Sequence, residues 1–138
     1  MVEIDVLYEG ELHCQARHAP SATVLATDAP VDNMGKGESF SPTDLLATSL
    51  GTCMATTMGV VARKNGWNID GVSLRVQKEM TKQPPRRVER LAVTFSIPAR
   101  VRSELDPNAK QALEQAARTC PVALSLSENV EVALALDW

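Results

Sequence analysis

The chain has 138 residues and a mass of 14.9 kDa, a size that suits one domain spanning 1–138. Its net charge of −3 excludes a general attraction to nucleic acid or to an anionic membrane surface. An odd number of cysteines, three, argues against a disulfide scaffold, and neither a secretory signal pattern nor a run of about 20 apolar residues is evident. We therefore expect a cytoplasmic protein whose cysteines have a redox or metal-binding role.

The N-terminal part of the sequence predicts three strands and a loop. Residues 2–8 alternate between apolar and acidic side chains, which is typical of a strand, and Glu9-Gly10 predicts a turn into a second strand. A third strand is expected over 22–27. A loop rich in turn-forming residues follows over 28–37.

One of the three cysteines belongs to the second strand. Cys14 falls on the same side of that strand as Leu12 and Ala16, because strand side chains alternate with a period of two. We expect Cys14 to face a sheet core and to remain reduced.

A long helix is predicted to begin at Ser41-Pro42-Thr43-Asp44. Serine is a preferred N-cap, proline suits the first helical position, and the aspartate three residues on can complete a capping box. The helix should end near Asn65, before Gly66. Its interior is apolar or small at nearly every position, so we expect it to be buried on all sides, under a sheet or against a second copy. One stripe of this helix carries Leu46, Leu50, Cys53, Thr57 and Val60.

The C-terminal half predicts a second hairpin, two helices and a last strand. Alternation from Val72 and again from Leu91 predicts two strands joined at Pro84-Pro85, with a solvated basic tip. Helices should begin at Asp106-Pro107 and at Cys120-Pro121, and a strand should begin near Val130. The order of elements predicts an α+β fold with largely antiparallel sheets. The basic residues around the diproline are Lys78, Lys82, Arg86, Arg87 and Arg90.

Two cysteines occupy helix positions that suit thiol chemistry. Cys120 is placed at an N-cap, where backbone N–H groups and the helix dipole favour a thiolate, and Cys53 lies within the long helix. Such a pair can act as peroxidatic and resolving cysteines: one sulfur attacks an O–O bond and becomes a sulfenic acid, and the other condenses with it to a disulfide. In apolar surroundings the first thiolate needs a nearby cation. Arg17 and Arg118 are the candidates.

Other chemistries are less well supported by the sequence. Potential metal ligands are present, but His13 and Cys14 point to opposite faces of a strand and no Cys-x-x-Cys pair occurs, which disfavours zinc. The Gly-x-Ser-x-Gly elbow, the Walker loop and the dinucleotide fingerprint are all missing, so we expect no cofactor. The residues considered as metal ligands are His13, Cys14, His18, Cys53 and Cys120.

The segment Ser41-Pro42-Thr43-Asp44-Leu45-Leu46, continuing to Cys53, together with Cys120-Pro121-Val122, resembles the OsmC/Ohr family of thiol peroxidases. The resemblance implies an OsmC-like α+β fold with antiparallel sheets around a long central helix, in an intertwined homodimer. It also implies reduction of organic hydroperoxides to alcohols, with Cys53 peroxidatic and Cys120 resolving. A dithiol, of the lipoyl type in some members, would restore the pair, and neither metal nor flavin is implied.

The sequence departs from the family pattern beside the first cysteine. In the best-characterised branch a glutamate follows the proline of the helix start and pairs with an arginine of the N-terminal strands, whereas this chain has Thr43 there. Asp44 is one residue further on, turned by about 100° around the helix, and only Arg17 lies in the segment of the arginine. The chain is thus more similar to the OsmC-like branch. The alternative function is a non-catalytic binding or sensor module that holds a small molecule or reactive sulfur species in the apolar dimer cavity.

Overall fold

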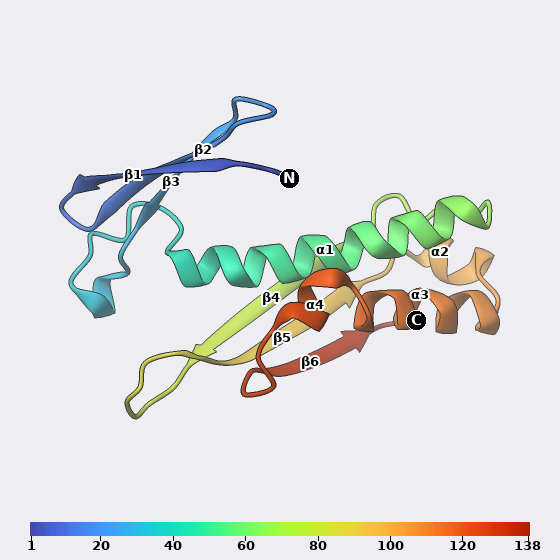
Figure 1. The fold of residues 1–138 in the computed structure, drawn as a ribbon. Helices are drawn as coiled ribbons and strands as arrows, with labels where there is room; N and C mark the ends of the chain where they lie inside the picture. Colours follow the sequence, from blue (N-terminus) through green and yellow to red (C-terminus); the bar gives the residue numbers. More distant parts are fainter. The chain divides into compact units, whose positions relative to one another are not determined.

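The computed structural model describes residues 1–138 as two compact units, Met1–Leu46 and Ala47–Trp138. The fold is α+β, as predicted, with two three-stranded sheets and a long helix (Figure 1).

The N-terminal unit contains an antiparallel sheet of β1 (Ile4–Gly10), β2 (His13–His18) and β3 (Val24–Asp28), in that order. The predicted turn at Glu9-Gly10 is wrong. The chain turns at Glu11 and Leu12, whose φ angles of 52° and 61° are those of the tight turns that connect twisted hairpin strands. Leu12 therefore belongs to the turn and not to the second strand.

The two faces of this sheet differ in polarity. Val6 is paired with Ala16 and Ala16 with Leu25, so these side chains share one face, together with Tyr8 and Cys14. Cys14 lies on the apolar side, as predicted, and is half-buried. The apolar face is largely uncovered within the chain: Val6 is 67% exposed and Tyr8 61% exposed. The opposite face is more polar, with Asp5, Glu9, Gln15 and Arg17 beside the exposed Leu7 and Val24.

Helix α1 (Pro42–Lys64) begins and ends as its sequence predicts. The Asp44 N–H donates to Ser41 Oγ over 3.1 Å, and the Ser41 N–H donates to Asp44 Oδ2 over 2.8 Å, which is a reciprocal capping box. At the other end Gly66 adopts a φ of 72°, and the Trp67 N–H bonds back to the Ala62 carbonyl.

Burial of α1 within one chain is limited to a single stripe. The expected burial of its other sides, against a second copy, stays a prediction. By length and composition alone α1 could cross a membrane, but its buried stripe packs on a sheet as a core helix does. The buried stripe consists of Ala47, Leu50, Gly51, Met54, Met58 and Ala62, whereas Thr48, Thr52, Thr56 and Val60 are exposed.

The C-terminal unit contains the second sheet, formed by β4 (Ser73–Met80), β5 (Val88–Ser96) and β6 (Glu131–Leu136). β4 and β5 form the predicted hairpin, but β6 is parallel to β5, so this half of the sheet is not antiparallel. The reason is the connection: α2 (Ala99–Glu104), α3 (Pro107–Arg118) and α4 (Pro121–Ser125) return the chain along the sheet before β6 begins. Of these helices, α2 was not predicted.

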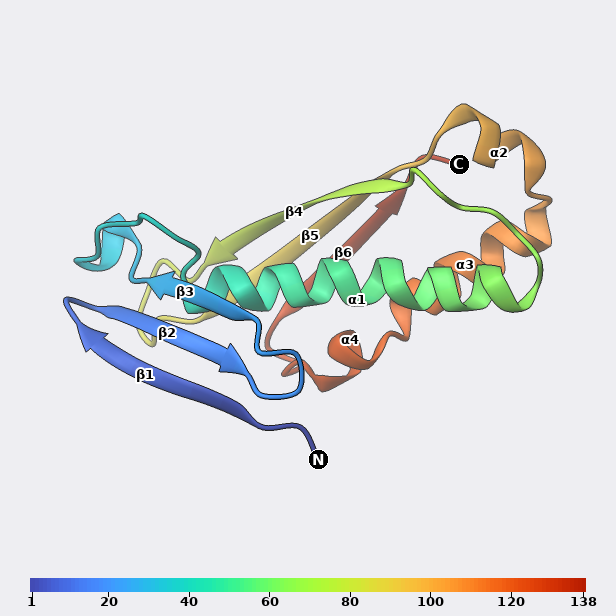
Figure 2. The same ribbon diagram turned by 90° about the horizontal axis from the view of Figure 1, so that it is seen from above.

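One face of this sheet is covered by helices. α1 runs along the sheet, and α3 and α4 lie beside it, toward β6 (Figures 1 and 2). The covered face buries Leu91, Val93 and Phe95 of β5, which alternate with exposed residues as expected of a half-buried strand. This packing sets α1 and the start of α4 on the same side of the sheet.

Candidate functional site

Cys53 is positioned by the packing of α1 on β4. A Cβ atom at Gly51 would lie 2.7 Å from Val76 Cγ2 and 2.8 Å from Leu74 Cδ1, so glycine allows the helix backbone to approach the sheet closely. Cys53 is two residues further on, about 200° around the helix, and is half-buried. It therefore lies off the face that contacts the sheet, where a reagent can reach its thiol.

Cys120 is the N-cap of α4, as predicted. Its Sγ accepts a hydrogen bond from the Ala123 N–H over 3.4 Å, and Pro121 occupies the first helical position. The residue is 0% exposed, the most enclosed of the three cysteines.

The structure brings Cys53 and Cys120 together although 66 residues of sequence separate them. Burial raises the pKa of the Cys120 thiol, and its hydrogen bond and charge interaction with Cys53 raise it further. The Ala123 and Val122 N–H groups act in the opposite direction but do not prevail. The backbone N–H groups at the N-cap therefore favour the Cys120 thiolate, as expected, but burial opposes them and has the larger effect on the pKa.

The two candidate cations each have a nearby carboxylate partner. Arg118 Nη2 is 2.6 Å from Glu114 Oε1, one turn back on α3. Arg17 Nη1 is 3.9 Å from Asp5 Oδ2 on the neighbouring strand, with both side chains mostly in solvent. Both guanidinium groups are therefore already paired with carboxylates.

The residues at the helix start explain what replaces the family glutamate. Thr43 Oγ1 is 3.1 Å from Ser41 Oγ, so the two hydroxyls share a hydrogen bond. The Asp44 carboxylate is held by the Ser41 N–H in the capping box. Asp44 thus has a structural role at the N-terminus of α1.

A hydrogen-bonded His–Asp pair in the N-terminal unit was missed by sequence reasoning. Asp28 is only 4% exposed, and its Oδ1 lies 2.6 Å from His13 Nδ1, while Oδ2 accepts the Glu38 N–H over 2.9 Å. The hydrogen bond from His13 lowers the pKa of Asp28, against the effect of burial. The signal was the strand pairing, since His13 and Asp28 are direct partners across β2 and β3. This pair anchors the loop after β3, and no group of three or more His, Cys, Asp or Glu side chains converges as a metal site.

Comparisons with known proteins identify the family of the chain. The family model of OsmC-like protein matches residues 35–135. Among solved structures, an osmotic stress and detoxification response protein, as it is named, from Psychrobacter arcticus 273-4 is 40% identical, with a TM-score of 0.90 over 99% of this chain and 96% of that one. None of the curated proteins matches.

More distant structures share the fold. An organic hydroperoxide resistance protein OsmC from Legionella pneumophila is 19% identical, with a TM-score of 0.76 over 100% of this chain and 97% of that one. A protein from Vibrio cholerae named for organic hydroperoxide resistance, with captopril bound in one of its active sites, is 16% identical, with a TM-score of 0.73 over 97% and 90% of the two chains. The family match over most of the chain and the 40% identity along nearly its whole length show that this protein belongs to the OsmC family.

Proposed function

We propose that this protein is a cysteine-dependent peroxidase that reduces organic hydroperoxides to alcohols, using Cys53 as the peroxidatic and Cys120 as the resolving cysteine. The observation that carries the proposal is the contact between a half-buried Cys53 and a fully buried Cys120. Two relatives of the same fold are named for organic hydroperoxide resistance, which agrees with it. Apolar residues flank Cys53 along α1, and this favours alkyl or lipid-derived peroxides over hydrogen peroxide.

The different environments of the two cysteines determine the order in which they react. Cys53 attacks first because its thiol can be reached, whereas Cys120 is enclosed and its pKa is raised, which keeps it protonated. Once Cys53 is oxidised, it no longer carries the charge that raises the pKa of Cys120. The N–H groups of Ala123 and Val122 then oppose burial alone, so the pKa of Cys120 moves back toward its ordinary value and the second nucleophile forms more readily after the first has reacted.

The reaction balances in three steps. The Cys53 thiolate attacks the terminal peroxide oxygen: an S–O bond forms, the O–O bond breaks, and the alkoxide takes up a proton and leaves as the alcohol. The Cys120 thiolate then attacks the sulfenic sulfur, forming the disulfide and releasing the oxygen as water. A dithiol reductant, of the lipoyl or a related type, exchanges with this disulfide, becomes a disulfide itself and leaves two protons on Cys53 and Cys120.

We further propose that the working form is a homodimer. The apolar face of the β1–β2–β3 sheet is uncovered, with Ile4 63% and Val6 67% exposed, and α1 presents an uncovered stripe of threonines and Val60. An exposed apolar sheet face of this kind is typical of protein interfaces. A second copy of the chain would cover both surfaces.

Hydroperoxide consumption by purified protein tests the proposed activity. With cumene hydroperoxide and a small dithiol, we expect the wild type to turn over many times, Cys53→Ser to show none, and Cys120→Ser to consume about one equivalent and stop at the sulfenic acid. Cys14→Ser is the matched control and should keep wild-type turnover, since Cys14 lies in the other sheet. If the wild type consumes about one equivalent or none with every alkyl hydroperoxide tried, the protein is a binding or sensor module and the peroxidase assignment fails.

A further inference from the structure

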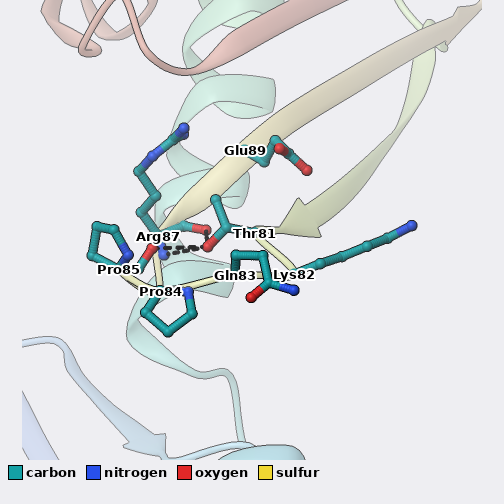
Figure 3. Close-up of a pocket in the computed structure, with 7 residues that line it drawn as sticks. All are labelled: Thr81, Lys82, Gln83, Pro84, Pro85, Arg87 and Glu89. Atoms are coloured by element: carbon teal, nitrogen blue, oxygen red, sulfur yellow. Dashed lines mark hydrogen bonds between the residues drawn. The ribbon is translucent and has the colours of Figure 1, made fainter.

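The tip of the β4–β5 hairpin forms a polar hollow with a volume of about 500 Å³. Residues of both strands and of the turn line it, and the Pro84–Pro85 peptide bond within it is cis. Thr81 Oγ1 accepts the Arg87 N–H over 3.1 Å, which closes the turn (Figure 3). The lining residues are Thr81, Lys82, Gln83, Pro84, Pro85, Arg87 and Glu89.

The tip is basic in an acidic protein. Residues 78–90 contain five cationic and two anionic side chains, a net charge of +3, whereas the whole chain carries −3. Arg90 is paired with Glu79 at 2.9 Å and with Glu131 at 3.0 Å, so it adds little to the outward field. Arg87 differs, because its guanidinium donates to the backbone carbonyls of Val88 and Asn129, which are neutral acceptors.

The shape of the tip suits a protein surface better than a small anion. Lys82 and Arg87 extend in different directions from the turn, so their charges do not converge on one ion (Figure 3). Both side chains are exposed, as an electrostatic docking contact requires. A long polyanion fits less well, since the rest of the chain carries a net charge of −6 and would repel it.

The tip also lies within reach of the thiols. Val76 on β4 contacts α1 at Gly51, two residues from Cys53. Lys82 follows Val76 by six residues, which is about 20 Å at about 3.3 Å per strand residue. A small protein domain is about 30 Å across. A domain docked on the tip can therefore present a reactive group at the cysteine pair.

We propose that the basic hairpin tip docks an acidic protein that carries the reducing dithiol. This inference rests on the proposed function, since it names the partner that regenerates the cysteine pair. One thiolate of the docked dithiol attacks the Cys53–Cys120 disulfide and forms a mixed disulfide while one protein thiolate leaves. The second thiol of the partner resolves the mixed disulfide, so the partner ends oxidised, the protein reduced, and two protons pass to the protein thiols.

A pair of synthetic dithiol peptides tests the docking. Each carries Cys-x-x-Cys, a Gly/Ser spacer of about eight residues, which can extend to about 26 Å, and a terminal segment of either glutamates or glutamines. The protein is first oxidised with diamide to the Cys53–Cys120 disulfide, so the measurement does not depend on peroxidase turnover. The rate of disulfide reduction is then compared at an ionic strength of about 0.01 M and of about 1 M, where the Debye length falls from about 30 Å to about 3 Å.

We expect the oxidised protein to be reduced faster by the glutamate peptide than by the glutamine peptide, and we expect this preference to depend on the charge of the hairpin tip. At low salt the glutamate peptide should react about tenfold faster than the glutamine peptide, and the advantage should vanish at high salt. Lys82→Glu and Gln83→Glu should each remove most of the rate advantage of the glutamate peptide. Lys110→Glu on α3 is the matched control, with the same change of net charge as Lys82→Glu, and should keep it. Dithiothreitol should reduce all four proteins at the same rate.

Other results overturn the docking proposal. Equal rates for the two peptides would do so, and so would an equal loss of preference in Lys110→Glu, which would be an effect of net charge alone. Tighter binding of a single-stranded oligonucleotide or of phosphatidylserine vesicles than of the glutamate peptide would assign the tip to a different partner. A peptide preference in a protein that does not turn over hydroperoxide would keep the docking site and reject the peroxidase.

Discussion

Gly51→Ala should destabilise the protein even though alanine is the better helix former. The added Cβ would lie 2.7 Å from Val76 Cγ2 and 2.8 Å from Leu74 Cδ1, closer than carbon atoms approach without displacement. Overpacking of this kind costs about 1–3 kcal/mol. Replacement of an interior helix glycine by alanine stabilises the helix by about 1 kcal/mol, which offsets part of this cost. The net loss in the free energy of unfolding should be about 1 kcal/mol.

Gly59→Ala on the same helix is the control for helix propensity. No atom lies within 4 Å of a Cβ built at Gly59, so the substitution should keep the gain of about 1 kcal/mol. The two variants should therefore differ by about 2 kcal/mol. For a chain of this size the difference corresponds to about 8 °C in Tm.

Thermal unfolding followed by circular dichroism measures the Tm of both variants, and urea titration gives their free energies of unfolding independently. The reasoning is refuted if Gly51→Ala is as stable as Gly59→Ala, since the close approach of α1 to β4 would then not exist in solution. Slower formation of the Cys53–Cys120 disulfide in Gly51→Ala should accompany the lower Tm, because the displaced helix carries Cys53.

Three further predictions concern the thiols, the buried aspartate and the dimer. Iodoacetamide at pH 8 should modify Cys53 at least about tenfold faster than Cys120, because Cys120 is enclosed and its pKa is raised; peptide mapping checks this, and equal rates would contradict it. The pKa of Asp28 is lowered by His13, so the stability that Asp28 contributes is present at neutral pH and is lost as the pH falls through its folded pKa, below 3.8. In His13→Ala the NMR titration of the Asp28 carboxyl carbon should move to higher pH, and an unchanged midpoint would show that the 2.6 Å contact has no effect. Val6→Glu should dissociate the dimer in sedimentation experiments while Leu7→Glu, on the polar face of the same strand, should not; a monomeric wild type at micromolar concentration would reject the dimer.

Most elements could be predicted because their signals are local. Alternation reveals β4 and β5, and the reciprocal capping of Ser41 and Asp44 is visible in four consecutive residues. The parallel pairing of β6 could not be read this way, since strand direction depends on the whole connection from residue 97 to 130. α2 was missed because its six residues are too few to show a helical period.

The features of the candidate site likewise divide into those with a local sequence signal and those that depend on tertiary structure. The N-cap position of Cys120 follows from the neighbouring proline, a local signal. Its complete burial, its contact with Cys53 and the direction of its pKa shift depend on residues brought together by folding. The His13–Asp28 pair was missed for the same reason, because strand register decides it.

Arg90 also determines how freely the hairpin tip can change during evolution. It sits on the middle strand, directly opposite Glu79 on one side and Glu131 on the other, and it bonds to both. These three side chains tie the strands together at one level of the sheet, and the irregular step in strand pairing between Glu79 and Met80 lies on the tip side of that level. An insertion or deletion within residues 81–87 is therefore absorbed beyond the tie and does not shift the strands that support α1. A change in the length or charge of this tip can therefore alter the proposed docking while the cysteine pair stays in place.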